Sequence, residues 1–355
     1  MSTIRDVAQA AEVSIATVSR VLNGSPRVSE DARERVWAAA DRLDYWPNTA
    51  ARSLTTRRSQ ALGVLLPDLY GEFFSEVIRG IDVAARDVHL QVLISSSHAN
   101  TKEVLTAARA MRGRIDGLII MAPDEGSIEP IHRIARRFPV LLLNPRSPVE
   151  GCSSVSVDNF SGSRALVEHL MQRGHRRIAI VKGPEGNLDA EDRLRGYHHV
   201  LAAAGVGTDA GLELDGDFTE SSGFLAGARI LAMTERPTAV FAANDSMAIG
   251  MLRAFRERGV RVPEDIAVSG FDDIAIASYL NPALTTVHVD AFELGRRAVH
   301  LLLPALATSA PLETQHEILP APIIVRESCG SRAPWSVASE DGAPAPVPSG
   351  RRSRS

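Results

Sequence analysis

The chain has 355 residues, of which 45% are hydrophobic and 23% are charged, and its formal net charge is −4. This length exceeds one typical core and indicates an ordinary globular protein of two or three domains. Two cysteines, Cys152 and Cys329, cannot supply a disulfide framework or a four-ligand zinc site, which favours a reduced, cytoplasmic compartment. We expect neither export nor membrane insertion, because the sequence has no signal-peptide core and no apolar run near the ~20 residues of a membrane span.

The charge is unevenly distributed along the chain. Residues 1–60 contain nine arginines and seven acidic residues, a net charge of +2, which leaves −6 for the rest. The overall negative charge argues against nucleic-acid binding. A mildly basic N-terminal segment on an acidic body nevertheless fits DNA contact that is confined to this segment.

The first predicted elements are two short amphipathic helices within residues 4–22. An apolar stripe marks the first helix: Ile4, Val7, Ala8 and Ala11. Thr3 and Asp6 have the pattern of a capping box, and Ser14 is a suitable N-cap for the second helix. Four residues of the second helix point outward: Ile15, Ala16, Ser19 and Arg20. This stretch matches a DNA-binding helix-turn-helix, and an ordinary helical hairpin fits it equally well.

A third helix and a short linker follow. The sequence predicts a turn at residues 23–28 and then a helix capped by Ser29, so residues 1–46 form a small three-helix domain. Residues 47–60 begin with Pro47 and contain a helical pattern shorter than the ~12 to 15 residues that make an isolated helix even marginal in water. We therefore expect this linker to be ordered only when something packs on it.

Beyond residue 61 the sequence predicts an α/β protein. Apolar runs predict strands at 61–67, 90–95, 117–122, 139–144, 177–183, 237–244 and 266–273. Helical patterns lie between many of them, at 73–88, 101–111, 161–173, 193–204 and 246–258. Short apolar strands that alternate with helices imply parallel sheets covered on both faces, and so many strands imply two α/β halves, divided near residue 160. Residues 331–355 are predicted to be a disordered tail.

Six motifs occur in order along the chain: TIRDVAQAAEVSIATVSRVLNG, PNTAARSL, GHRRIAIVKG, AANDSMAIG, PEDIAVSGFDD and LTTVHVD. Through them, residues 2–328 resemble the lactose-repressor and purine-repressor family of bacterial transcription regulators. The resemblance implies a small all-α helix-turn-helix head (1–46), a hinge helix and linker (47–60), and an α/β periplasmic-binding-protein-like core of two subdomains (61–330). It also implies three chain crossings, with an N-subdomain at about 61–160 and 290–328 and a C-subdomain at about 161–289.

The outward face of the second helix is the candidate surface for contact with DNA bases. Arg20 can donate two hydrogen bonds to guanine O6 and N7, although a solvated or phosphate-binding arginine is the alternative. Ile15 and Ala16 can supply only apolar contact, and the resemblance implies that they help to set operator choice. Four polar residues are candidate phosphate contacts: Thr17, Ser19, Asn23 and Arg27. Glu12 stands where many family members have glycine, which costs strain if its φ is positive.

The hinge holds a candidate wedge. The resemblance implies that Leu54 is pushed into the minor groove at a central base step, where it unstacks and kinks the duplex. An incidental apolar residue is the alternative. Two small residues, Ala50 and Ala51, would let the hinge helices of a homodimer approach closely.

The resemblance assigns an effector site to the ends of the strands, where ligands of open α/β sheets bind. Its polar members are Arg193, Asn244 and Asp272, with Asn144 near the edge of the first subdomain. Its apolar walls are Phe73, Phe74 and Phe218. The alternatives are helix capping for Asn244 and Asp272 and core packing for the phenylalanines, which we favour for Phe74.

These residue types suit a sugar, a nucleoside or a purine base. Three acids near the mouth argue against an anionic effector: Asp189, Glu191 and Asp192. We expect no catalytic residue, metal or cofactor, because the GxSxG, HExxH and P-loop motifs are absent from the sequence. The sequence thus predicts a ligand-responsive repressor that binds double-stranded, pseudo-palindromic operator DNA as a homodimer. The alternatives are an enzyme and a sugar-transport binding protein.

Overall fold

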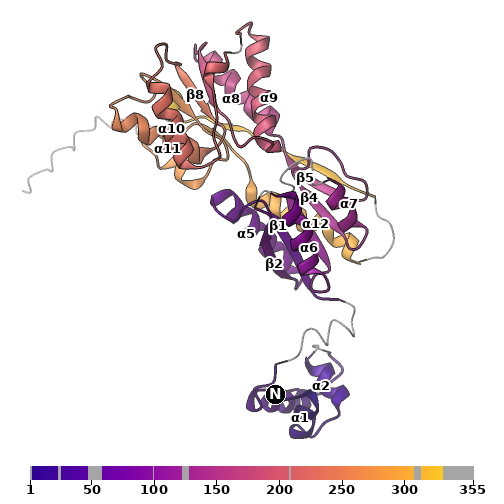
Figure 1. Ribbon diagram of the computed structural model, residues 1–355. Helices are drawn as coiled ribbons and strands as arrows, with labels where there is room; N and C mark the ends of the chain where they lie inside the picture. Colours follow the sequence, from indigo (N-terminus) through magenta and orange to yellow (C-terminus); the bar gives the residue numbers. More distant parts are fainter. Residues whose placement is uncertain are drawn as a thin grey trace, which may run out of the picture. The chain divides into compact units, whose positions relative to one another are not determined.

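The computed structural model describes residues 2–22, 25–46, 58–98, 100–121, 128–207, 209–307 and 313–330 (Figure 1). The chain divides into two compact units, each built from two separate stretches. Unit 1 is Met1–Ser156 with Ala291–Glu317, and unit 2 is Val157–Asp290 with Ile318–Ser355. Within the described ranges, none of the helices combines the length and the apolar character that crossing a membrane would require.

The N-terminal part of unit 1 consists of three helices: α1 (Ile4–Ala10), α2 (Ile15–Leu22) and α3 (Glu30–Arg42). The predicted capping box is confirmed, because the Thr3 side chain accepts the Asp6 N–H while the Asp6 side chain accepts the Thr3 N–H. Ser14 and Ser29 cap the next two helices, as predicted. In the turn between α1 and α2, the φ of Glu12 is +53°, so the strain expected of a non-glycine residue is present.

These three helices share one small core. Its fully buried members come one from each helix: Val7, Val18 and Val36. The Arg35 guanidinium of α3 donates to the Ala11 carbonyl at 3.0 Å, which ties α3 to the end of α1. The position of α2 is therefore set by packing on its inner face, and its outer face is left for contacts with another molecule.

A six-stranded sheet, mainly in unit 1, has the strand order β11-β5-β4-β3-β1-β2. Its strands are β1 (Ala61–Leu66), β2 (Gln91–Ser96), β3 (Gly117–Met121), β4 (Val140–Leu143), β5 (Ser153–Val157) and β11 (His316–Leu319). The accompanying helices are α5 (Glu72–Asp87), α6 (Thr101–Met111), α7 (Ile128–Ala135) and α12 (Ala291–Ala307). Strands β1 to β5 pair in parallel, and every residue of β1, β3 and β4 is buried, as predicted for strands covered on both faces.

Unit 2 has a second parallel sheet, with the order β7-β6-β8-β9. Its strands are β6 (Ile178–Val181), β7 (Glu213–Leu214), β8 (Ala239–Ala242) and β9 (Ala267–Ser269). Its helices are α8 (Asn159–Gln172), α9 (Leu188–Ala203), α10 (Glu220–Leu231) and α11 (Asp245–Glu257). Three short helical turns belong to it as well: Ala210–Leu212, Ala275–Ser278 and Glu327–Cys329. An antiparallel ribbon joins β10 (Thr286–Val287) to β12 (Ile323–Ile324).

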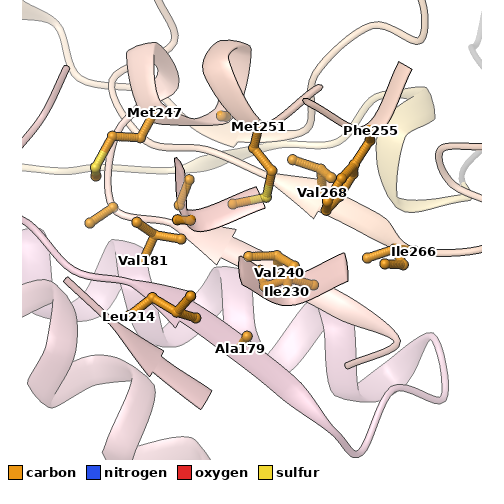
Figure 2. Close-up of a cluster of buried hydrophobic side chains, with 14 of the residues drawn as sticks. Ala179, Val181, Leu214, Ile230, Val240, Met247, Met251, Phe255, Ile266 and Val268 are labelled. Atoms are coloured by element: carbon orange, nitrogen blue, oxygen red, sulfur yellow. The ribbon is translucent and has the colours of Figure 1, made fainter. Parts of the chain in front are cut away.

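One face of this second sheet packs against α10 and α11. Side chains of α11, including Met247 and Met251, lie over Val181 of β6, Val240 of β8 and Val268 of β9 (Figure 2). The strand residues that alternate with these are also buried, among them Ile178, Ile180 and Phe241. Both faces of the sheet are therefore covered, which leaves its edges and strand ends as the places where polar groups can meet a ligand.

Several elements differ from the sequence-based expectation. Five strands were not predicted: β5, β7, β10, β11 and β12. The helices α7, α10 and α12 were not predicted either, and α9 begins at Leu188 rather than at residue 193. Residues 318–328, expected in the N-subdomain, pack instead with unit 2. Hydrogen bonds hold them there: the Ser328 hydroxyl donates to the Val268 carbonyl at 2.6 Å, and the Arg326 guanidinium donates to the Leu284 carbonyl at 2.9 Å.

Glycines allow α10 and α11 to lie in close contact. A Cβ atom on Gly223 would lie 2.0 Å from the Met247 carbonyl oxygen, and one on Gly250 would lie 1.9 Å from the Glu220 carbonyl oxygen. Both distances are far below van der Waals contact with backbone atoms that cannot rotate away. The two helices can therefore pack in this way only if these positions lack a side chain.

We predict that Gly223→Ala lowers the free energy of unfolding by about 1–3 kcal/mol, because overpacking forces α10 away from α11. Gly207→Ala is the matched control, since a Cβ atom there meets nothing within 4 Å. Urea unfolding of both variants checks the prediction. Equal effects of the two substitutions would contradict the close contact.

Candidate functional site

The candidate effector residues of unit 2 lie where the strands of its parallel sheet end. Phe218 follows β7, Asn244 follows β8, Asp272 follows β9, and Arg193 lies on α9, the helix after β6. Because the carboxyl ends of parallel strands share one edge of the sheet, these four residues, distant in sequence, come together there.

Arg193 is the centre of this group and is only 5% exposed. Its Nε donates to Asn159 Oδ1 at 2.9 Å, and its Nη1 donates to the Ala243 carbonyl at 2.5 Å. Its Nη2 lies 3.1 Å from Asp272 Oδ1 in an ion pair. Each nitrogen of the guanidinium thus has a partner from a different segment, which holds the group in one orientation before any ligand binds.

Two aromatic rings lie beside the Arg193 guanidinium. Its central carbon is 3.8 Å from the ring centroid of Phe271 and 5.7 Å from that of Phe218, so the cation is stabilised by ring faces as well as by charge. Phe218 has a φ of +68°, and its carbonyl accepts a hydrogen bond from Asn244 Nδ2 at 3.0 Å. Asn244 also caps α11 by accepting the Met247 N–H, so the helix-capping alternative holds for this residue.

Sequence reasoning missed Asn159 and Phe271. Asn159 is 3% exposed and connects Arg193 to Asp189, to which its Nδ2 donates at 2.9 Å. It lies directly after β5 and the N-cap residue Asp158, so the same strand-end rule would have found it had β5 been recognised. Phe271 is wholly buried one position before Asp272, where an apolar residue indicates core packing rather than contact with a cation.

The loop after β9 is strained and divides two neighbouring carboxylates between different partners. Asp272 and Asp273 have φ values of +106° and +56°, a conformation that costs energy in non-glycine residues and is concentrated at functional sites. Asp272 faces Arg193. Asp273 instead accepts a hydrogen bond from Arg326 Nη2 at 2.7 Å, and its other oxygen lies 2.9 Å from His288 Nδ1.

The helix-capping alternative for Asp272 is wrong. The helical turn Ala275–Ser278 has Ile274 at its N-cap, without a side-chain hydrogen bond. The Ile274 N–H instead donates to Asp245 Oδ2 at 3.0 Å, and the Thr286 hydroxyl donates to the other oxygen of Asp245 at 2.6 Å. Asp245 is therefore the group that fixes this loop, which leaves Asp272 for Arg193.

Burial controls the ionisation of both acids. It raises the pKa of Asp272 to about 6, against the lowering effect of Arg193 and with a further contribution from the Asp189 carboxylate. Burial, with the charge of Asp272, also raises the pKa of Asp245 well above its usual range. The site thus combines a buried cation with carboxyl groups that resist ionisation, an arrangement suited to hydrogen bonding with polar, uncharged groups.

The remaining effector candidates belong to unit 1. Asn144 follows β4, is 8% exposed and has a φ of +46°. Phe73 and Phe74 lie in the first turn of α5, with ring centroids 5.3 Å apart in an edge-to-face pair. Both rings are partly exposed, so the core-packing alternative for Phe74 holds only in part. All three residues follow strands of the parallel sheet of unit 1, β4 or β1, at its carboxyl edge.

In the head, three of the candidate DNA-binding residues on α2 are exposed: Ile15, Ala16 and Arg20. Thr17 and Ser19 are half-buried, and the Thr17 hydroxyl lies 2.9 Å from that of Ser14. Arg27 is exposed in the segment before α3. Candidates Asn23, Ala51 and Leu54 lie outside the described residues, as does the predicted tail at 331–355. Among the residues with described positions, no group of three or more potential metal ligands occurs.

We predict that the stability of Asp272→Asn relative to wild type rises with pH between 4 and 6. Between pH 4 and 6, the folded wild type retains a proton that the unfolded chain has released, so wild-type stability falls as pH rises through this window. Asparagine resembles the protonated carboxyl group and does not titrate. The unfolding free energy of the variant minus that of wild type should therefore increase by up to about 3 kcal/mol from pH 4 to 6 and stay level above pH 6.

Thermal unfolding at several pH values between 4 and 8 measures this difference. Asp215→Asn is the control, because the Asp215 side chain is 89% exposed. A difference between Asp272→Asn and wild type that does not change with pH would contradict the assignment.

Two family models match the chain. Residues 3–48 match bacterial regulatory proteins of the lacI family, and residues 167–329 match a periplasmic binding protein-like domain. These matches establish the predicted helix-turn-helix head and α/β core, and they remove the helical-hairpin alternative for residues 4–22.

Similar proteins and structures agree with these matches. The ribose operon repressor of Escherichia coli (strain K12) is 33% identical over 329 residues, which are 92% of this chain and 98% of that protein. The HTH-type transcriptional repressor CytR of the same organism is 36% identical over 306 residues, or 85% and 89% of the two chains. The lac repressor dimer bound to operator and an anti-inducer has a TM-score of 0.81 at 33% identity, covering 92% of this chain and 99% of that one. These relatives are repressors rather than enzymes, and the chain belongs to the lacI family of bacterial regulatory proteins.

Proposed function

We propose that this chain is a homodimeric transcriptional repressor that binds operator DNA through its head and a small polar effector through its core. One observation carries the proposal: a buried, preorganised Arg193–Asp272 pair lies at the strand ends of a chain whose head presents Arg20 on an outward helix face. A regulator of this family needs both parts, whereas an enzyme or a transport protein has no use for the head. The relatives named above, all repressors, support this function.

The exposed face of α2 is the proposed DNA-reading surface. Arg20 would contact a guanine, while Ile15 and Ala16 would pack against base edges such as a thymine methyl group. The proposed phosphate contacts are Thr17, Ser19, Asn23 and Arg27. In the hinge, Leu54 would insert into the minor groove, and Ala51 would allow two hinge helices to pair across the dimer axis.

An apolar surface on unit 1 supports the dimer. β2 is the edge strand of its sheet, and four apolar residues on or beside β2 and α5 are each 39–41% exposed: Val83, Val88, Leu93 and Ile94. An exposed apolar edge strand promotes association unless another chain covers it. A second copy related by a two-fold axis would cover it, and the paired heads would then require an inverted-repeat operator.

The effector we propose is a sugar, a nucleoside or a purine. A guanidinium and a neighbouring carboxyl group can hydrogen-bond adjacent hydroxyl groups of one ligand, as donor and acceptor respectively. The nearby carboxyl groups of Asp189, Asp272 and Asp245 disfavour an anion. Binding would control pairing of the hinge helices by favouring one arrangement of the subdomains, and only to the extent that the ligand binds that arrangement more tightly.

The test begins with a DNA duplex that the wild-type chain selects from a random library. Operator affinity is then measured with and without D-ribose, cellobiose, cytidine, adenosine and hypoxanthine, alongside a thermal shift for each. A true effector raises the melting temperature and changes operator affinity about 5- to 150-fold, and Arg193→Lys weakens both effects. Failure to select any duplex, or turnover of a ligand without DNA binding, would overturn the proposal.

We predict that Arg20→Ala weakens binding to the selected duplex by about 1–3 kcal/mol and relaxes specificity at one base pair. Arg27→Ala is the matched control, since it also removes one exposed arginine from the head. Because Arg27 is a proposed phosphate contact, Arg27→Ala should weaken binding to all sequences equally. The slope of log affinity against log salt concentration should become shallower by about one. Gel-shift titrations at several salt concentrations separate the two outcomes.

We predict that Leu54→Ala weakens binding to the selected duplex far more than binding to random DNA. Insertion kinks the duplex only in the specific complex, so its loss should leave the electrostatic, sequence-independent affinity nearly unchanged. Equal losses on both DNAs in a gel-shift titration would rule out the wedge.

A further inference from the structure

The first residues of the core, 58–60, are held by several hydrogen bonds to distant parts of the chain. The Ser59 N–H donates to Asp116 Oδ1 at 2.6 Å, and the Gln60 N–H donates to Asp116 Oδ2 at 2.8 Å. The Asp116 N–H in turn donates to the Ala61 carbonyl at 2.8 Å. One residue therefore binds three successive residues at the point where the linker from the head meets β1.

The position of Asp116 beside β1 explains how one residue can bind Ser59, Gln60 and Ala61. It precedes β3, which pairs in parallel with β1 from Leu62 and Gly117 onward, so it extends the ladder by one residue. A carboxylate that accepts two successive backbone N–H groups forms charge-assisted hydrogen bonds, which are stronger than those between neutral groups. The Gln60 carbonyl accepts the Gln91 N–H at 2.9 Å beside the β1–β2 ladder, and Asp116 adds partners for the N–H groups of Ser59 and Gln60.

A second contact comes from the C-terminal end of α12. Arg58 Nη2 donates to the Leu306 carbonyl at 3.2 Å, one of the last four carbonyls of α12, which lack a partner within the helix. A cation is also favoured there by the helix dipole. The Leu306 side chain packs on Gly117, where an added Cβ atom would lie 2.8 Å from Leu306 Cδ2. Both contacts therefore meet at the amino end of β3.

The other end of α12 lies at a chain crossing. α12 begins at Ala291, the first residue after the second passage of the chain between the units, and its 17 residues span about 25 Å. It is pressed against α5 near this end: a Cβ atom on Gly295 would lie 2.1 Å from the Val77 carbonyl oxygen, and one on Gly80 would lie 2.0 Å from the Phe292 carbonyl oxygen. So tight a contact leaves little freedom for this end of the helix to rotate by itself, while Pro304 lies near the other end, two residues before Leu306.

We propose that Arg58, Ser59, Gln60, Asp116 and Leu306 form a clamp through which the core controls the DNA-binding head. Asp116 and Arg58 are positioning residues, which act through the contacts that hold the start of the core to β3 and to the end of α12. A displacement of α12 at the chain crossing therefore moves residues 58–60, where the linker meets β1. This inference rests on the proposed repressor function.

The clamp also pre-organises the head for DNA binding. With the linker fixed at residue 58, less conformational freedom remains to be lost when heads and hinges align on an operator. Loss of the clamp should therefore weaken specific binding, which requires this alignment. Non-specific binding depends on phosphate charge alone and should not change.

Asp116→Asn and Asp116→Ala test the carboxylate contact in the full-length protein. We expect amide hydrogen exchange at Ser59 and Gln60 to rise at least tenfold, and affinity for the selected duplex to fall about tenfold. Affinity for a random duplex and the melting temperature of the core should stay within error of wild type. Asp265→Asn is the matched control, since Asp265 accepts a backbone N–H and an arginine within its own loop, residues 261–265.

Arg58→Gln tests the α12 contact, with Arg57→Gln removing the same charge from the preceding position. Arg58→Gln should weaken specific binding about threefold more than Arg57→Gln does. Arg58→Gln also tests the clamp if Asp116→Ala fails to fold. Unchanged exchange at Ser59 and Gln60, or equal losses on specific and random DNA, would overturn the clamp. Failure of wild type to select any duplex would overturn the repressor function instead, and the exchange measurement would still decide whether the clamp exists.

Discussion

The structure of unit 2 depends on one buried ion pair, that between Arg193 and Asp272. Placing a guanidinium at 5% exposure is costly unless every nitrogen has a partner, and here the partners come from the segments that follow β5, β8 and β9. The strand ends must therefore converge on one point. Burial still dominates, because the Asp272 pKa remains raised beside its counter-ion. Such a pair adds little net free energy of unfolding, but loss of one partner would leave a buried charge uncompensated, so the pair determines where the strand ends meet.

Much of the fold could be predicted from continuous apolar runs. β1, β3, β4, β6 and β8 are buried on both faces, and hydrophobicity alone identifies such strands. The rest depends on tertiary contacts. β5 has the sequence SSVSV and β7 has two residues, so neither has an apolar run. The α10 sequence ESSGFLAGARIL contains two glycines, which indicate a poor helix until the close contact with α11 explains them. The return of residues 318–328 to unit 2 has no local signal at all.

The candidate site likewise combines residues that the sequence predicts with residues that only the structure reveals. Arg193, Asn244 and Asp272 were predictable from motifs at strand-to-helix junctions, and the structure brings them together with Phe218. Asn159 was missed because its strand was missed. Phe271 was missed because its function, stacking on a cation, appears only in three dimensions. The hydrogen bonds of Asp116 to Ser59 and Gln60 likewise join residues more than fifty positions apart, and no sequence pattern near either partner predicts them.

The divergent orientation of Asp272 and Asp273 has an evolutionary consequence. Asp272 faces the candidate ligand site, whereas Asp273 binds His288 and Arg326, which lie on the two segments that lead toward the chain crossings. Adjacent residues thus contact the candidate ligand site and the segments that lead to the chain crossings separately. In the proposed repressor, a substitution of Asp272 would change the effector contact and leave the contacts of Asp273 intact. Under that proposal, a duplicated gene would acquire a different signal without a new switch.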